Sequence, residues 1–126
     1  MAMPYHEPVD ELSPQARDMH RALCSLIEEL EAVNWYNQRA DVTPSPDLQA
    51  VLLHNRDEEI EHAAMTLEWI RRQIPKFDEE LRTYLFTSGS ITAVEEGGES
   101  ASAESRSNPS SPASSDLGIG SLKKGG

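Results

Sequence analysis

The sequence is poor in several residue types that common protein classes require. It contains one cysteine, Cys24, so it cannot form an internal disulfide, which favours a reducing, cytoplasmic compartment. Lys and Arg number 11 against 22 Asp and Glu, for a net charge of −11, so we expect no nucleic-acid binding through a basic face. A run of about 18 apolar residues and a basic, apolar leader are both missing, so we expect neither a membrane span nor a signal peptide.

Large apolar side chains are also scarce. Apolar residues make up 37% of the 126 residues and aromatic residues 6%, which is low for a chain that folds alone around one core. The composition therefore indicates a small, acidic, cytoplasmic protein that needs partners to bury its apolar surface.

Composition divides the chain into a helical part and a tail. We expect a flexible N-terminus over residues 1–12 and a helical domain over residues 13–94. Residues 95–115 are dominated by Gly, Ser, Pro, Ala and Glu, which bury too little surface to fold, so they are expected to form a disordered linker. Apolar residues return in the last segment, 116–126.

The sequence of the helical part predicts two long helices. Ser13 is a good N-cap and Pro14 a good first residue for a helix that runs to about residue 39. Pro44 and Pro46 are expected to interrupt the helix, after which Asp47 caps a second helix.

That second helix covers about residues 48–73 and stops at Pro75, and a shorter helix is expected over residues 77–86. The predicted fold is all-α: an antiparallel two-helix hairpin plus a short C-terminal helix. Such a hairpin leaves an apolar face uncovered, so we expect oligomerisation to cover it.

Carboxylates occupy positions of the apolar stripes. Glu29 continues the inward row of the first helix, and Glu59 and His62, three residues apart, share the inward row of the second. A buried carboxylate must be protonated, paired or bound to metal. Counted from the turn, Glu29 lies ten residues (about 15 Å) and Glu59 twelve residues (about 18 Å) along its helix, at nearly the same level.

This set is half of a di-iron carboxylate site, which ferritin-like proteins build from two single glutamates and two Glu-x-x-His pairs. Two chains would supply both halves. Carboxylate and imidazole ligands suit Fe(II), and the sequence does not distinguish Fe(II) from Mn(II) or Zn(II) as the bound metal. The alternative is that Glu59 and His62 form only a surface pair on their helix.

Neighbouring residues have competing interpretations. Glu28 and Glu31 form either an acidic approach for cations or a solvated acidic face, and the residues alone favour the second. Tyr36 is either a hydrogen-bond donor behind the site or a core tyrosine, and Trp35 and Trp69 are most simply packing residues.

Three further side chains are not assigned to the site. His54 lies five residues before Glu59, roughly on the opposite side of the helix, and His20 has no carboxylate in a ligand-like position on its face. Cys24 has no partner at zinc-like spacing and is expected to be a buried thiol.

The runs EELEAVNWYNQR and HNRDEEIEHAAMTLEWIRR closely resemble the encapsulated ferritin family, over about residues 19–92. The tail segment DLGIGSLK resembles the peptide by which cargo proteins are loaded into encapsulin nanocompartments. The resemblance implies a ferroxidase that oxidises Fe(II) with O₂ at a di-iron centre formed between two chains. It also implies that the hairpin is half of a ferritin four-helix bundle that dimerisation completes. The dimers are expected to assemble into an open ring, typically of ten chains, inside an encapsulin shell in the cytoplasm.

Residue by residue, the resemblance implies that Glu29, Glu59 and His62 are the iron ligands from each chain. It assigns Glu28 and Glu31 to metal approach, with Ca(II) or other divalent ions as candidate occupants, which reverses the interpretation from the residues alone. Trp35 and Tyr36 correspond to aromatic residues near the centre. The implied targeting residues are Asp116, Leu117, Gly118, Ile119, Gly120, Ser121, Leu122 and Lys123.

The apolar members of this peptide are expected to seat in pockets of the shell, and its glycines to permit an extended backbone. The alternative function is a non-catalytic helical scaffold that binds metal and is carried as encapsulin cargo.

Overall fold

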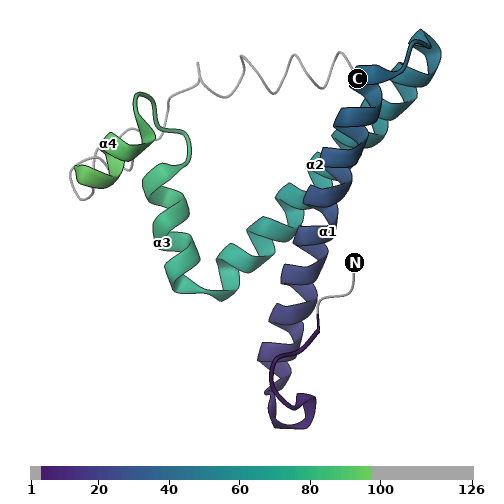
Figure 1. Ribbon diagram of the computed structural model, residues 1–126. Helices are drawn as coiled ribbons and strands as arrows, with labels where there is room; N and C mark the ends of the chain where they lie inside the picture. Colours follow the sequence, from purple (N-terminus) through teal and green to yellow (C-terminus); the bar gives the residue numbers. More distant parts are fainter. Residues whose placement is uncertain (1–3, 98–126) are drawn as a thin grey trace. The chain divides into compact units, whose positions relative to one another are not determined.

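A computed structural model describes residues 4–97 of the chain, and within this range every regular element is helical (Figure 1). The predicted all-α class is confirmed. The described residues fall into two compact units that divide between Ile70 and Arg71. The expected linker beyond Gly97 and the C-terminal peptide lie outside the described residues. In the described range, no helix is both long enough and apolar enough to cross a membrane.

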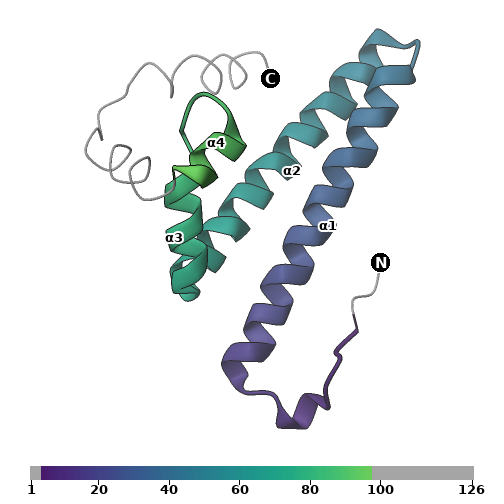
Figure 2. The ribbon, with the colours of Figure 1, turned by 60° about the vertical axis from the view of Figure 1, so that its left-hand side comes forward.

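Two long helices form most of the first unit. A short 3₁₀ helix, η1 (Val9–Glu11), precedes α1 (Pro14–Val42), and α2 (Pro46–Gln73) follows after a three-residue turn and ends just inside the second unit. Figure 2 shows α1 and α2 running antiparallel, side by side, from this turn. The predicted hairpin is confirmed.

Serine side chains begin both long helices. The Ala16 amide donates to Ser13 Oγ at 3.0 Å, as expected for the N-cap of α1. At the second helix the prediction was wrong, because Ser45, not Asp47, is the cap: its Oγ accepts from the Leu48 amide at 3.2 Å. Pro46 does not interrupt the helix but is its first residue, where the missing N–H costs nothing.

Polar contacts join the two long helices near the turn. Gln49 Nε2 donates to the Ala40 carbonyl at 2.9 Å, and Arg56 Nη1 donates to Asn37 Oδ1 at 3.0 Å. Ala40, in the last turn of α1, is also buried.

Much of the hairpin's apolar surface remains exposed. In the described part of this unit, the buried apolar side chains are Ala40, Ala63 and Ile70, of which Ile70 is fully buried. Large apolar side chains of α1 and α2 that remain exposed include Ile27, Leu30, Trp35, Leu48, Val51, Ile60, Met65 and Trp69. A single hairpin therefore lacks the closed core that an isolated domain needs.

The segment before α1 contacts that helix. The Tyr5 ring stacks on the His20 ring with centroids 4.0 Å apart. The Arg17 guanidinium donates twice to the Val9 carbonyl, from Nη2 at 2.7 Å and from Nε at 3.1 Å.

Two short helices, rather than the one expected, lie in the second unit. α3 (Pro75–Tyr84) begins and ends two residues earlier than predicted, and α4 (Ile91–Glu96) was not predicted (Figure 1). Phe86 and Gly89 between them have φ angles of 61° and 85°, so the chain reverses there. Ser90 then caps α4, its Oγ accepting from the Ala93 amide at 3.4 Å.

Asp78 joins the last turn of α2 to α3. Its Oδ1 accepts from Arg71 Nη1 and, at 2.9 Å, from Arg82 Nε. Partial desolvation acts to raise the pKa of Asp78, but the two guanidinium groups outweigh it and hold this pKa below its ordinary value.

Candidate metal centre

Glu29 lies on the side of α1 that faces α2. Its side chain is half-buried, and its Oε2 lies 3.3 Å from the hydroxyl of Thr66 on α2, which can donate to it. The same hydroxyl lies 3.0 Å from the carbonyl oxygen of His62, one helical turn earlier. The inward position predicted for Glu29 is thus where the structure has it, with a polar partner on the opposite helix.

Glu59 and His62 share one face of α2. The Nδ1 atom of His62 lies 3.9 Å from Oε2 of Glu59, a loose ion pair rather than a hydrogen bond. The Glu59 side chain is 27% exposed and the His62 side chain 46% exposed, so an external group can reach both. This is more open than the buried stripe that the apolar pattern predicts.

A single chain does not assemble these residues into a complete site. In the described part of the chain, no three His, Cys, Asp or Glu side chains lie close enough to hold one metal ion together. Glu29 contacts Thr66, which lies seven residues beyond Glu59 on α2.

Glu29 contacts Thr66 although a count from the turn places Glu29 level with Glu59. Helical side chains lean toward the N-terminus of their helix, so a side chain of α1 reaches residues of α2 that lie farther from the turn. This lean gives the direction of the shift and amounts to about one residue on each helix, so counting residues from the turn missed Thr66. The sequence did contain one signal for this contact: Thr66 carries a hydroxyl four residues after the proposed ligand His62, on the same side of the helix.

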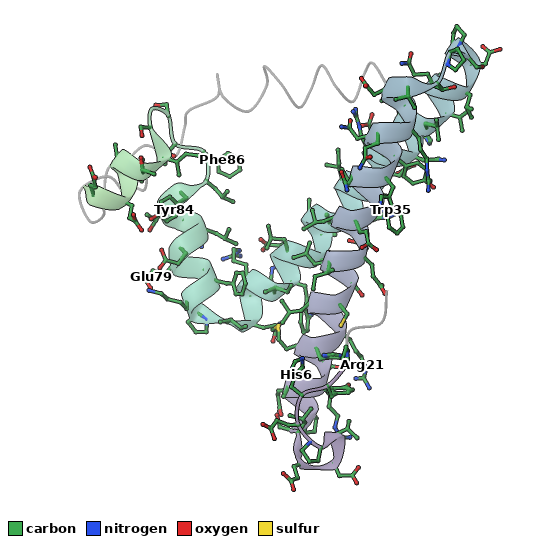
Figure 3. The ribbon with its side chains drawn as sticks, viewed as in Figure 1. His6, Arg21, Trp35, Glu79, Tyr84 and Phe86 are labelled. Atoms are coloured by element: carbon green, nitrogen blue, oxygen red, sulfur yellow. The ribbon has the colours of Figure 1, made fainter. Side chains whose placement is uncertain are left out.

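Acidic and aromatic residues surround Glu29 along α1. Glu28 is exposed and Glu31 half-buried. Tyr36 is half-buried, and the Arg39 guanidinium carbon lies 5.6 Å from the centre of its ring. Trp35 is 48% exposed and projects away from the helix in Figure 3. With Gln38 and Arg39 it lines an open hollow.

Two histidines outside the site have partners one helical turn away. His54 Nε2 lies 3.4 Å from Glu58 Oε1 on the exposed side of α2. His20 Nε2 lies 3.4 Å from Cys24 Sγ, and Cys24 is half-buried rather than fully buried. The expectation of a buried thiol was therefore wrong, since Cys24 keeps part of its surface exposed and meets His20 at helical i, i+4 spacing.

Taken together, the fold and these side chains define the class: a two-helix chain that carries one glutamate on one helix and a Glu-x-x-His pair on the other. The family model described as EncFtn-like matches residues 4–88. The chain therefore belongs to the EncFtn-like family, the encapsulated ferritins, as its sequence motifs indicate.

Individual relatives agree with this placement. An encapsulated ferritin-like protein of Rhodospirillum rubrum is 52% identical over 121 residues, which cover 94% of this chain and 86% of that protein. A ferritin-like protein of Thermotoga maritima is 59% identical over 96 residues, covering 76% of this chain and 84% of that protein. An encapsulin nanocompartment cargo protein of Myxococcus xanthus, EncC, is 38% identical over 113 residues, covering 82% and 87%.

A solved structure resembles the fold as well. The crystal structure of a protein from Nitrosomonas europaea superposes with a TM-score of 0.68 at 62% sequence identity. The match covers 69% of this chain and 96% of that one. It supports the helical arrangement described above.

Proposed function

We propose that this protein is a ferroxidase whose di-iron centre forms where two copies of the chain meet. Each copy would supply Glu29, Glu59 and His62. The observation that carries the proposal is the partly exposed Glu59–His62 pair, 3.9 Å apart on α2, with the Glu29 carboxylate turned toward the same helix from α1. One chain thus presents half of a ligand set that a second chain can complete.

The chemistry of the donors fits iron. Two copies of Glu29 and Glu59 carry four negative charges, which balance two divalent ions. Carboxylate and imidazole ligands suit Fe(II), and the hard carboxylates favour Fe(III) still more, which drives the oxidation forward. Iron is the substrate, and O₂ is the electron acceptor. The protein's part is to hold two ions at a fixed separation so that both can give electrons to one O₂ molecule.

The exposed apolar side chains of the hairpin support assembly. Leu30 of α1 is 54% exposed and Met65 of α2 is 62% exposed, although both lie on helices that carry proposed ligands. A second hairpin would cover such side chains and complete a four-helix bundle. We propose a homo-oligomer built from such dimers, with a ring of ten chains as its expected form.

The C-terminal segment supports packaging. The relative from Myxococcus xanthus is an encapsulin cargo protein, and the match with the encapsulated protein of Rhodospirillum rubrum extends beyond Gly97. We propose that residues 116–126 bind the inner wall of an encapsulin shell, which places the enzyme inside a nanocompartment in the cytoplasm. Each tail needs to bind only weakly, because an assembly of many tails gains avidity.

Stopped-flow oxidation of Fe(II) tests the proposed centre. The full-length chain is loaded with Fe(II) without oxygen, mixed with O₂ and followed by ferric absorbance. We expect a fast phase that saturates at about one iron per chain, because two chains share two ions. Glu59→Ala should lose this phase, since it removes a ligand from both halves of the centre.

The adjacent glutamate supplies the matched control. Glu58 is exposed and pairs with His54, so Glu58→Ala removes the same charge from α2 and should keep the fast phase. Equal, slow oxidation in wild type, Glu59→Ala and Glu58→Ala would contradict the proposal. The helical part would then be a metal-binding scaffold without catalytic activity.

A further inference from the structure

Thr66 forms a polar contact between Glu29 on α1 and the helix that carries Glu59 and His62. It lies on α2 one turn after His62, and its side chain is half-buried. Its Oγ1 is 3.3 Å from Glu29 Oε2 on α1 and 3.0 Å from the His62 carbonyl oxygen. One hydroxyl therefore touches two residues that the proposed function makes ligands.

A threonine hydroxyl has one proton to donate, so these two acceptors compete for it. Threonine in a helix often donates to the carbonyl four residues earlier, and that bond holds the side chain in one rotamer. The Glu29 carboxylate is charged, and hydrogen bonds to charged acceptors are stronger than those to neutral ones. The hydroxyl proton can be shared between the two oxygen atoms in a three-centre hydrogen bond, and the charged carboxylate is the stronger of the two acceptors.

We infer that Thr66 is a positioning residue for Glu29. Its hydroxyl fixes Oε2 of the carboxylate and leaves Oε1 free to point elsewhere. Because the same hydroxyl touches the backbone of His62, Glu29 is tied to the helix that carries the other two ligands. This inference rests on the proposed function and adds a residue to it.

Residues that hydrogen-bond to metal ligands orient those ligands, and substituting them typically lowers metal affinity by about 10- to 100-fold. Thr66→Val keeps the branched shape and removes the donor, so the affinity for metal should fall about 10-fold. Thr66→Ser keeps the donor and loses only a methyl group, and it should bind as wild type does.

The experiment is a titration of the full-length chain with Co(II), followed by the visible absorbance of the bound ion, together with the steady-state kinetics of Fe(II) oxidation. We expect Thr66→Val to raise the KM for Fe(II) while kcat changes little, and Thr66→Ser to restore both values. Thr83→Val is the matched control, because Thr83 also donates to the carbonyl four residues earlier, on α3, which carries no proposed ligand. Thermal unfolding of the metal-free proteins reports any purely structural effect.

Different results overturn different claims. If Glu59→Ala loses binding and Thr66→Val binds Co(II) as wild type does, the role of Thr66 is overturned and the proposed centre stands. If Thr66→Ser binds as weakly as Thr66→Val, the hydroxyl is not responsible, and the inference is also wrong. If Glu59→Ala itself binds and oxidises metal normally, the proposed function fails first.

Discussion

At the scale of single residues, two acidic side chains lie next to the proposed ligand Glu29 on α1. Glu28 precedes Glu29 and is exposed, and Glu31 lies two residues further and is half-buried. Negative charge near an open site raises the local concentration of cations, and salt weakens the effect. These two side chains are therefore proposed to draw Fe(II) toward the centre without being part of it.

The double variant Glu28→Gln with Glu31→Gln tests this role. At low ionic strength and low Fe(II) concentration, the initial oxidation rate should fall about 10-fold, since two attractive charges are lost. The maximal rate at high Fe(II) should be unchanged. The measurement is the initial rate against Fe(II) concentration at two salt concentrations.

Glu7→Gln with Glu11→Gln removes the same charge from the exposed N-terminal segment and serves as the control. A rate that stays at the wild-type value for Glu28→Gln with Glu31→Gln in low salt would exclude electrostatic attraction by this pair.

At the scale of helices, the local signals in the sequence predicted beginnings and ends with mixed success. Ser13 and Pro14 mark the start of α1 correctly, because the capping geometry depends only on neighbouring residues. Pro46 was misread, since proline interrupts a helix only in its interior and starts one at its first position. The α4 helix was missed because six residues carry too little periodicity to be recognised.

The residues of the candidate site were predictable within each helix but not across the two helices. The ligand candidates Glu29, Glu59 and His62 follow from helical spacing within one chain. The contact between Glu29 and Thr66 depends on how two helices pack against each other across the hairpin. Helical spacing can place the Thr66 hydroxyl on the inward side of α2, but it does not say which side chain of α1 that hydroxyl meets.

The hydrogen bonds of Asp78 with Arg71 and Arg82 predict how stability depends on pH. Arg71 and Arg82 hold the pKa of Asp78 below its ordinary value, so the contribution of Asp78 to stability is complete above about pH 4. It is lost as the pH falls through the lowered pKa. We expect Asp78→Asn to lower the thermal unfolding midpoint at pH 7, and the gap from wild type to narrow toward pH 3.

The measurement is the unfolding midpoint of both proteins at one chain concentration across this pH range. Glu79→Gln is the control, because Glu79 forms an exposed pair with Lys76 inside α3 and should contribute little. A gap for Asp78→Asn that stays as wide at pH 3 as at pH 7 would contradict the assignment.

At the scale of the whole molecule, the proposed chemistry and the proposed targeting belong to separate parts of the chain. The candidate ligands lie on α1 and α2, and the proposed targeting peptide is residues 116–126. Deleting residues 116–126 should therefore leave Fe(II) oxidation intact and abolish co-purification with encapsulin shells. Both are measured on the same preparation, with and without co-expressed shell protein. Truncated protein that still co-purifies with shells would place the targeting signal elsewhere.

The exposed apolar surface of the hairpin has a consequence for the amount of assembled protein in a cell. Apolar side chains such as Leu30 and Met65 are exposed on the single chain, and in the proposed assembly they would stay exposed until the chain meets another copy. That meeting depends on the square of the chain concentration, whereas capture by proteases depends on its first power. The steady-state level should therefore rise more steeply than the rate of synthesis, so that a small increase in expression produces a large increase in assembled protein.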